Sequence, residues 1–256
     1  KGGVICMEFF DCNVCYGCDV RSKIMLPVNN VEDLVSQMKN AGVAKAMVNR
    51  LELFVGGTSV SNQILADDIA KYDNLYGIWG LLPSHTHEIP EGEQMLKAMK
   101  KNRIFGWRLI PNIGRYLVKD FVLRDWFIIA VERRIPIFIN TAHGTSLEAV
   151  ADILKSYPEL TVILTYANVW PSDRLLRPFV AEYPNVYIDL TYCITDGGIE
   201  SFVKEYGSDR LLYGSGFPYS YFGANMLMIK HADISESDKL AIASGNLSRI
   251  IEEVLL

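Results

Sequence analysis

Residues 7–17 hold an unusual density of side chains that could take part in chemistry. Asp11, Asn13 and Cys15 stand at alternate positions of an aromatic and β-branched run that ends at a glycine. This composition predicts a buried strand over residues 7–14 followed by a turn. Because side chains alternate across a strand, the three polar residues are expected on one face. The opposite face is expected to carry Phe10, Cys12 and Val14.

Cysteines are also concentrated near this strand. The chain has five: Cys6, Cys12, Cys15, Cys18 and Cys193. The spacing of Cys12, Cys15 and Cys18 is one that iron–sulfur and zinc sites use. Against such a cluster, Cys12 and Cys15 are expected on opposite faces of the strand, and no fourth ligand is evident. Free, reduced thiols packed around a strand of a cytoplasmic protein are therefore predicted, with a metal–thiolate cluster as the alternative.

Two charged side chains interrupt later apolar runs. Arg108 lies within residues 105–110 and Asp189 within residues 187–190, where an unpaired buried charge is costly. In one interpretation these charges pair with each other or with backbone groups. In the other, Arg108 holds the carboxylate of a substrate in a two-pronged contact. Further polar candidates follow other apolar runs: Asn49, Arg50, Asn140, His143, Tyr166, Asn168, Thr191, Ser215 and Tyr219.

A regular alternation of apolar runs and helical patterns positions these side chains. Strands are predicted over residues 7–14, 43–49, 75–82, 104–110, 135–139, 161–166, 186–191 and 211–215. Helices are predicted over residues 31–41, 59–72, 92–101, 121–133, 147–157, 173–183, 199–206 and 237–254. Near-continuous apolar strands indicate a parallel sheet covered by helices. Eight such units predict a single-domain (β/α)8 TIM barrel over residues 1–256, with the polar candidates at the carboxyl ends of its strands. On pattern alone, an open doubly wound sheet is the alternative.

Composition narrows the class of partner. The formal net charge of the 256 residues is −5, and lysines and arginines are scattered, which argues against a nucleic-acid surface or a basic membrane patch. There is no apolar run of membrane-spanning length, and the first residues lack the apolar core of a signal peptide. Glycine-rich nucleotide loops are also missing. A cytoplasmic protein with a small-molecule ligand, a carboxylate being one option, is predicted; a homodimer stays open.

Several stretches resemble the amidohydrolase-related family. Members of this family are TIM barrels, and they include small-acid hydrolases and metal-dependent decarboxylases. Residues 11–17 resemble its Asp-x-His-x-His-x-Gly motif, and residues 183–189 its Tyr-Pro-Asn-Val-Tyr-(apolar)-Asp motif. Residues 209–218 are similar to Asp-Arg-(apolar)-(apolar)-(aromatic)-Gly-Ser-Asp-(aromatic)-Pro. Residues 135–141, 162–168 and 245–250 also resemble motifs of the family. The resemblance implies a hydrolase or lyase of small organic acids, lactones or amides.

The resemblance also marks five positions at which the family binds a divalent metal. In this chain they are Asn13, Cys15, Asn140, Tyr166 and Gly216. Catalytic zinc needs about three histidine or carboxylate ligands and lowers the pKa of its water to about 7. Asparagine is a weak neutral donor, and glycine at position 216 also removes a general base. No ordinary metal site and no cofactor are predicted, unless zinc or another divalent ion is held by rebuilt ligands.

Histidines offer one route to such rebuilding. His85 and His87 follow the third predicted strand and could join His143 in a displaced cluster. A solvated loop with two unrelated histidines is the simpler interpretation. His231 is expected at the surface.

Three classes of function stay open. The chain is an enzyme without metal or with a rebuilt site, a pseudoenzyme that binds a small molecule as a sensor or regulatory subunit, or a barrel used for assembly. Polar groups at the pocket end favour the first two. For an enzyme, Cys15 is the candidate nucleophile and His143 the candidate base. The predicted substrate-binding residues are Asn13, Arg108, Asn140, Tyr166, Asp189 and Tyr219.

Overall fold

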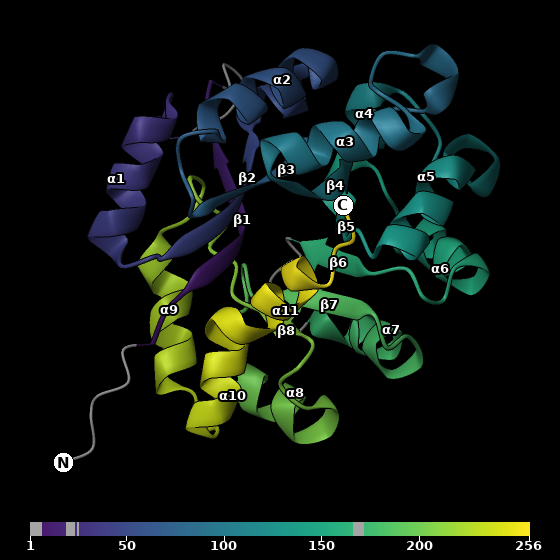
Figure 1. Cartoon of the computed structure of the whole chain (residues 1–256). Coiled ribbons are helices and arrows are strands. Elements are labelled where there is room, and N and C mark those ends of the chain that lie inside the picture. Colours follow the sequence, from purple (N-terminus) through teal and green to yellow (C-terminus); the bar gives the residue numbers. More distant parts are fainter. Residues whose placement is uncertain (1–6, 19–23, 25, 166–171) are drawn as a thin grey trace.

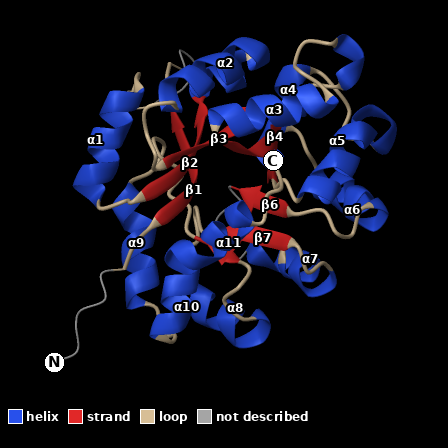
Figure 2. Ribbon diagram, in the orientation of Figure 1, coloured by secondary structure: helices blue, strands red, loops and turns tan. Residues whose placement is uncertain are grey.

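A barrel of eight parallel strands forms the centre of the molecule, surrounded by helices (Figures 1 and 2). The computed structural model describes residues 7–18, 24, 26–165 and 172–256. Neighbouring strands pair in chain order, and the Cys12 N–H donates to the carbonyl of Tyr213 after the last strand (2.9 Å), which closes the sheet. The (β/α)8 barrel is thus confirmed and the open doubly wound sheet is wrong. The strands are β1 (Phe10–Tyr16), β2 (Lys45–Arg50), β3 (Leu75–Gly80), β4 (Ile104–Leu109), β5 (Ile137–Asn140), β6 (Val162–Thr165), β7 (Val186–Asp189) and β8 (Leu211–Leu212).

Helices follow the strands and pack around the outside of the barrel, except α11, which lies across the barrel in this view (Figure 1). They are α1 (Val31–Ala41), α2 (Thr58–Ile69), α3 (Gly92–Asn102), α4 (Pro111–Gly114), α5 (Asp120–Arg133), α6 (Leu147–Ser156), α7 (Arg177–Glu182), α8 (Gly198–Tyr206), α9 (Phe222–His231), α10 (Glu236–Leu240) and α11 (Asn246–Glu252). No helix in the described ranges combines the length and the apolar composition that a membrane span requires.

Local sequence explains the sharp ends of α1. The Asn30 side chain accepts a hydrogen bond from the Asp33 N–H (2.8 Å), which satisfies a donor that the first turn leaves free. At the other end Gly42 adopts a left-handed conformation (φ 80°), which a glycine accepts without steric strain. Val31, Leu34 and Met38 form the buried stripe between these ends, as their spacing predicts.

The helical region predicted over residues 237–254 is present. It consists of α10 and α11 with a π-helical turn at Ala241–Gly245 between them. Helix α9 was not predicted, since apolar residues surround it: it buries Met226 and Ile229 while Leu227 is exposed. Helix α11 places Leu247, Ile250 and Ile251 in the apolar cluster inside the barrel.

A β-bulge in β1 overturns the predicted alternation of its side chains. The pairing of β1 with β2 shifts register between Asp11 and Val14. Phe10 and Cys12 pack inside the barrel, whereas Val14 packs in the outer core beneath the helices. The common face predicted for these three residues is therefore wrong, because the extra residue of a bulge reverses the alternation. As a result, the side chains of Cys12 and Asn13, although consecutive, both face the inside of the barrel.

Candidate functional site

The inside of the barrel is divided into an apolar layer and a polar layer. Alternate residues near the middle of the strands, including Met47, Phe138 and Ile163, form the apolar layer. One step further towards the carboxyl ends, the inward-facing side chains are polar and buried. They are Asn13, Cys15, Asn49, Arg108, Asn140, Thr165 and Asp189. A stack of layers is the normal filling of such a barrel, and active sites of the fold lie at this end.

Asn13 connects two charged side chains in the polar layer. Its Nδ2 donates to Asp189 Oδ2 at 2.9 Å, and its Oδ1 accepts from Arg108 Nη2 at 3.2 Å. Asp189 Oδ2 also accepts from the hydroxyl of Thr191 (3.0 Å). The sequence-based pairing of Arg108 with Asp189 is thus indirect: one neutral carboxamide stands between the two charges.

The hydrogen bonding of Arg108 is incomplete although the side chain is fully buried. Besides Asn13, its acceptor is the Thr165 hydroxyl, 3.4 Å from Nη1, and Nε has no acceptor. The guanidinium carbon lies 5.5 Å from the centre of the Phe138 ring. Within the described ranges no carboxylate is at ion-pairing distance from it. Burying a cation with weak neutral acceptors is unfavourable, so this site has spare capacity for an anion.

Cys15 and His143 are each uncharged in this environment. The Cys15 thiol accepts from Asn49 Nδ2 (3.4 Å), and burial raises its pKa to about 11. Burial, reinforced by the positive charge of Arg108, lowers the pKa of His143 to about 3. The imidazole lies 4.4 Å from the ring of Phe54, its Nδ1 is buried without a partner, and no hydrogen bond joins it to Cys15. The structure does not bring the two together as a nucleophile and base, and their catalytic role stays a prediction.

Asp11 is a buried carboxyl between the first and last strands. Its Oδ1 accepts from the N–H groups of Asn13 (3.0 Å) and Ser215 (3.1 Å), while Oδ2 has no partner. Burial raises its pKa to about 6. Sequence reasoning placed Asp11 on the face of Asn13 but did not anticipate titration near neutral pH, because that property comes from the enclosure supplied by the segment after β8.

Comparison with known proteins identifies the family. The sequence model described as amidohydrolase matches residues 29–250. The chain belongs to the amidohydrolase family. Its fold agrees with this assignment, since solved structures of similar barrels superpose on almost the whole chain.

Three such structures illustrate the likeness. An uncharacterised TIM-barrel protein from Bordetella bronchiseptica is 17% identical, with a TM-score of 0.74 over 96% of this chain and 99% of that chain. A 2,6-dihydroxybenzoate decarboxylase from Rhizobium is 13% identical, with a TM-score of 0.75 over 96% and 99%. A 5-carboxyvanillate decarboxylase from Novosphingobium aromaticivorans, complexed with manganese and 4-hydroxy-3-methoxy-5-nitrobenzoic acid, is 16% identical, with a TM-score of 0.71 over 98% of both chains. At these identities the likeness shows the fold alone.

Of the five amidohydrolase metal positions, the four that the structure describes do not present a ligand set. The carboxamide of Asn13 is bonded at both ends, the thiol of Cys15 has a raised pKa, and Gly216 has no side chain. In the described part of the chain, no three His, Cys, Asp or Glu side chains come together as a metal site. The residues present do not fit the metal centre that the family resemblance implies.

Rebuilding by histidines does not occur among the described residues. His85 and His87 are exposed, and His87 Nδ1 is 2.8 Å from Glu91 Oε1. The simpler interpretation of a solvated loop agrees with these positions. His231 ends α9 at the surface, as predicted.

The other predicted site residues have diverse positions. Asn140 accepts from the Ala142 N–H (2.9 Å) and caps the 3-10 turn Thr141–His143. Tyr219 is 45% exposed in the loop after β8. Tyr166 and Asn168 lie outside the described residues. Cys12 and Cys15 are buried and Cys18 is exposed, all three as free thiols, in agreement with reduced cysteines.

Proposed function

We propose that this amidohydrolase-family protein binds a small organic carboxylate in the polar layer of its barrel, as a sensor or regulatory subunit, without a metal at the five marked positions. The observation that carries the proposal is the position of Asn13. It stands at a metal-ligand position, engages Asp189, and offers Arg108 only a neutral acceptor. The same contact therefore accounts for both the loss of a metal donor and the retention of a cation in need of an anion.

A carboxylate is the chemical group that suits Arg108 best. Hydrogen bonds between a guanidinium and a carboxylate are shorter and about twice as strong as those with neutral acceptors. The present acceptors lie at 3.2 and 3.4 Å, and Nε has none. An incoming carboxylate that displaced Asn13 Oδ1 could engage Nε and Nη2 together, the pair of donors that planar recognition uses.

Aromatic acids are the first ligands to test. The solved structures of similar fold include a complex with 2,6-dihydroxybenzoate, whose carboxylate is attached to a flat ring. The Phe138 ring beside Arg108 supports a flat ligand of this kind. Benzoates are therefore the probes of choice.

Isothermal titration with benzoate and 2,6-dihydroxybenzoate, against the uncharged methyl benzoate, tests the proposal. The acids should bind and the ester should not. Arg108→Lys, which keeps the charge and loses the paired donors, should weaken binding by about tenfold or more. Arg103→Lys, on the connection between α3 and β4, is the matched control and should bind like wild type. Binding of acid and ester alike, or an unchanged Arg108→Lys, would contradict the proposal.

The metal content of the purified protein tests the second part of the proposal, that the five marked positions hold no metal. Protein purified without chelators or a histidine tag, and the same protein treated with excess zinc or manganese, should retain no stoichiometric metal after gel filtration. About one retained ion per chain, lost in Cys15→Ser, would show that the marked positions still form a centre.

A residual hydrolase or lyase activity is the second candidate, favoured by Asp11. A carboxyl with a pKa of about 6 can exchange a proton near neutral pH. Turnover of acids, lactones or amides with an inflection near pH 6, lost in Asp11→Asn, would support it. Turnover unchanged in that variant would remove Asp11 from the reaction.

A further inference from the structure

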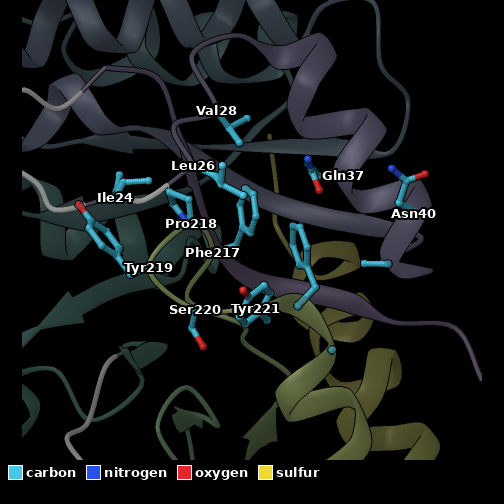
Figure 3. Close-up of a pocket in the computed structure, with 13 residues that line it drawn as sticks. Ile24, Leu26, Val28, Gln37, Asn40, Phe217, Pro218, Tyr219, Ser220 and Tyr221 are labelled. Carbon is cyan, nitrogen blue, oxygen red and sulfur yellow. The ribbon is translucent and has the colours of Figure 1, made fainter.

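A cavity lies outside the barrel, between α1 and the loop that joins β8 to α9 (Figure 3). Its volume is about 430 Å³, within the range of small-molecule pockets. Three segments form its walls: the connection before α1, the exposed side of α1, and residues 217–223, which are the end of the β8–α9 loop and the first two residues of α9. None of the described residues that line it belongs to the polar layer around Arg108.

We propose that this groove, lined by Leu26, Gln37, Asn40, Phe217, Tyr221 and their neighbours, binds a neutral aromatic small molecule. The site goes beyond the carboxylate function proposed above and does not depend on it.

Aromatic and aliphatic side chains supply most of the lining. Phe217 and Phe222 stack with ring centres 4.2 Å apart and an angle of 11° between their planes. Leu26 and Tyr221 are 77% and 83% exposed, which is unfavourable for side chains of this size and character when they are gathered in one place. A flat apolar ligand would cover these side chains and could continue the ring stack.

Two carboxamides give the groove a polar side without charge. Gln37 and Asn40 are three residues apart on α1 and therefore share one face of the helix. Figure 3 shows both amides on the α1 side of the groove and the rings of Phe217 and Tyr219 away from that helix. Amides donate and accept, so they suit a hydroxyl, carbonyl or amide group. No described lining residue carries a charge, so an ionised ligand would lose hydration without gaining a counter-ion.

The groove is held in place by hydrogen bonds to the barrel. The Cys15 N–H donates to the Phe217 carbonyl (2.8 Å), and the Phe217 N–H donates to the Ser215 hydroxyl (3.0 Å). Tyr213 Oη donates to the Phe222 carbonyl (3.0 Å). A wall fixed at both ends loses little conformational freedom on binding, which favours a small ligand over a partner that has to remould the loop.

The experiment uses 2-naphthol as a neutral probe and 2-naphthoate as its charged counterpart, with calorimetry and saturation-transfer NMR. 2-Naphthol should bind wild type in a saturable manner, and 2-naphthoate should not displace it. Displacement is the decisive comparison, because naphthoate could also bind at Arg108. For the same reason Arg108→Lys should leave 2-naphthol binding unchanged, which separates failure of this proposal from failure of the carboxylate proposal.

Two variants locate the probe. A Cβ at Gly223 meets no atom within 4 Å, so Gly223→Leu is sterically accepted and takes up groove volume; it should weaken 2-naphthol by about tenfold or more. Ala224→Leu, the exposed neighbour on α9, is the matched control and should bind like wild type. Gln37→Ala with Asn40→Ala changes two exposed side chains and should weaken 2-naphthol by about fivefold through the lost hydrogen bonds.

Three outcomes would overturn the proposal. Equal binding by Gly223→Leu would place the probe elsewhere, and displacement by 2-naphthoate would remove the requirement for neutrality. Concentration-dependent self-association abolished by Gly223→Leu, with no naphthol binding, would show that a second copy of the chain covers the groove.

Discussion

Arg108 on β4 and Asp189 on β7 are connected through the carboxamide of Asn13, and no direct ion pair joins them. A neutral amide separates the charges while it hydrogen-bonds to both. Position 13 is one that the family resemblance assigns to a metal ligand, and in this chain its carboxamide hydrogen-bonds to both charged side chains.

Replacing Asn13 by Leu should therefore destabilise the protein strongly. The substitution keeps the number of side-chain heavy atoms and their branching, but it removes one hydrogen-bond partner from the buried Arg108 and one from the buried Asp189. Removing one member of such an arrangement costs about 3–5 kcal/mol. Urea unfolding measures the loss. Asn185→Leu, which removes a single hydrogen bond to the Glu159 carbonyl, is the control and should lose about 1 kcal/mol. Equal losses of unfolding free energy in the two variants would show that the hydrogen bonds of Asn13 stabilise the protein no more than an ordinary hydrogen bond does.

The fold can be predicted from patterns that are visible in the sequence. Strands buried on both faces read as apolar runs, and alternation with helices gives a parallel barrel, so the strand ends and the gathering of Arg108, Asn140 and Asp189 were predictable. The bulge in β1 was not, because no glycine or proline marks the Asp11–Val14 interval where the register shifts.

The contacts within the site lie beyond sequence reasoning for a different reason. Whether Arg108 meets Asp189 directly or through Asn13 depends on the registers of strands that are far apart in the chain. Tyr219 was predicted at the substrate site because it follows β8, and in the structure it lines the outer groove. Only the three-dimensional path of the loop after β8 could reveal this.

Asp11 should make stability fall as pH rises through the weakly acidic range. Its folded pKa of about 6 lies above the ordinary aspartate value of 3.8, so the folded state holds the proton more tightly. The stabilisation is complete below about pH 4 and is lost by about pH 6, a change of about 3 kcal/mol from a shift of about two pKa units. Urea unfolding gives the free energy of unfolding of wild type and Asp11→Asn at each pH. The difference between the two proteins should change by this amount from pH 4 to 7.5. Parallel pH profiles would contradict the burial of an ionisable group at this position.

His143 should make stability fall as pH decreases, which is opposite to the effect of Asp11. Its folded pKa of about 3 lies below the ordinary histidine value of 6.5, so the unfolded state binds the proton more readily. Stability contributed by the neutral ring is present above pH 6.5 and is lost as pH falls towards the folded value. His143→Phe keeps an aromatic ring against Phe54 without titrating, so it should lose less stability than wild type between pH 7 and pH 5. His87→Phe, at an exposed position, serves as the control; a His143→Phe variant as acid-sensitive as wild type would contradict the buried, neutral imidazole.

Thiol reactivity should distinguish a buried Cys15 from a catalytic one. With a pKa raised to about 11, Cys15 is almost entirely protonated at pH 7.5, and the thiolate is the reactive form. Iodoacetamide should therefore label the exposed Cys18 first and Cys15 only when urea opens the barrel. Peptide mass spectrometry over a time course measures both sites, and Cys18→Ser should leave the slow labelling of Cys15 unchanged. Labelling of Cys15 in the folded protein as rapid as that of Cys18 would mean that the thiol is accessible and activated, and would restore it as a candidate nucleophile.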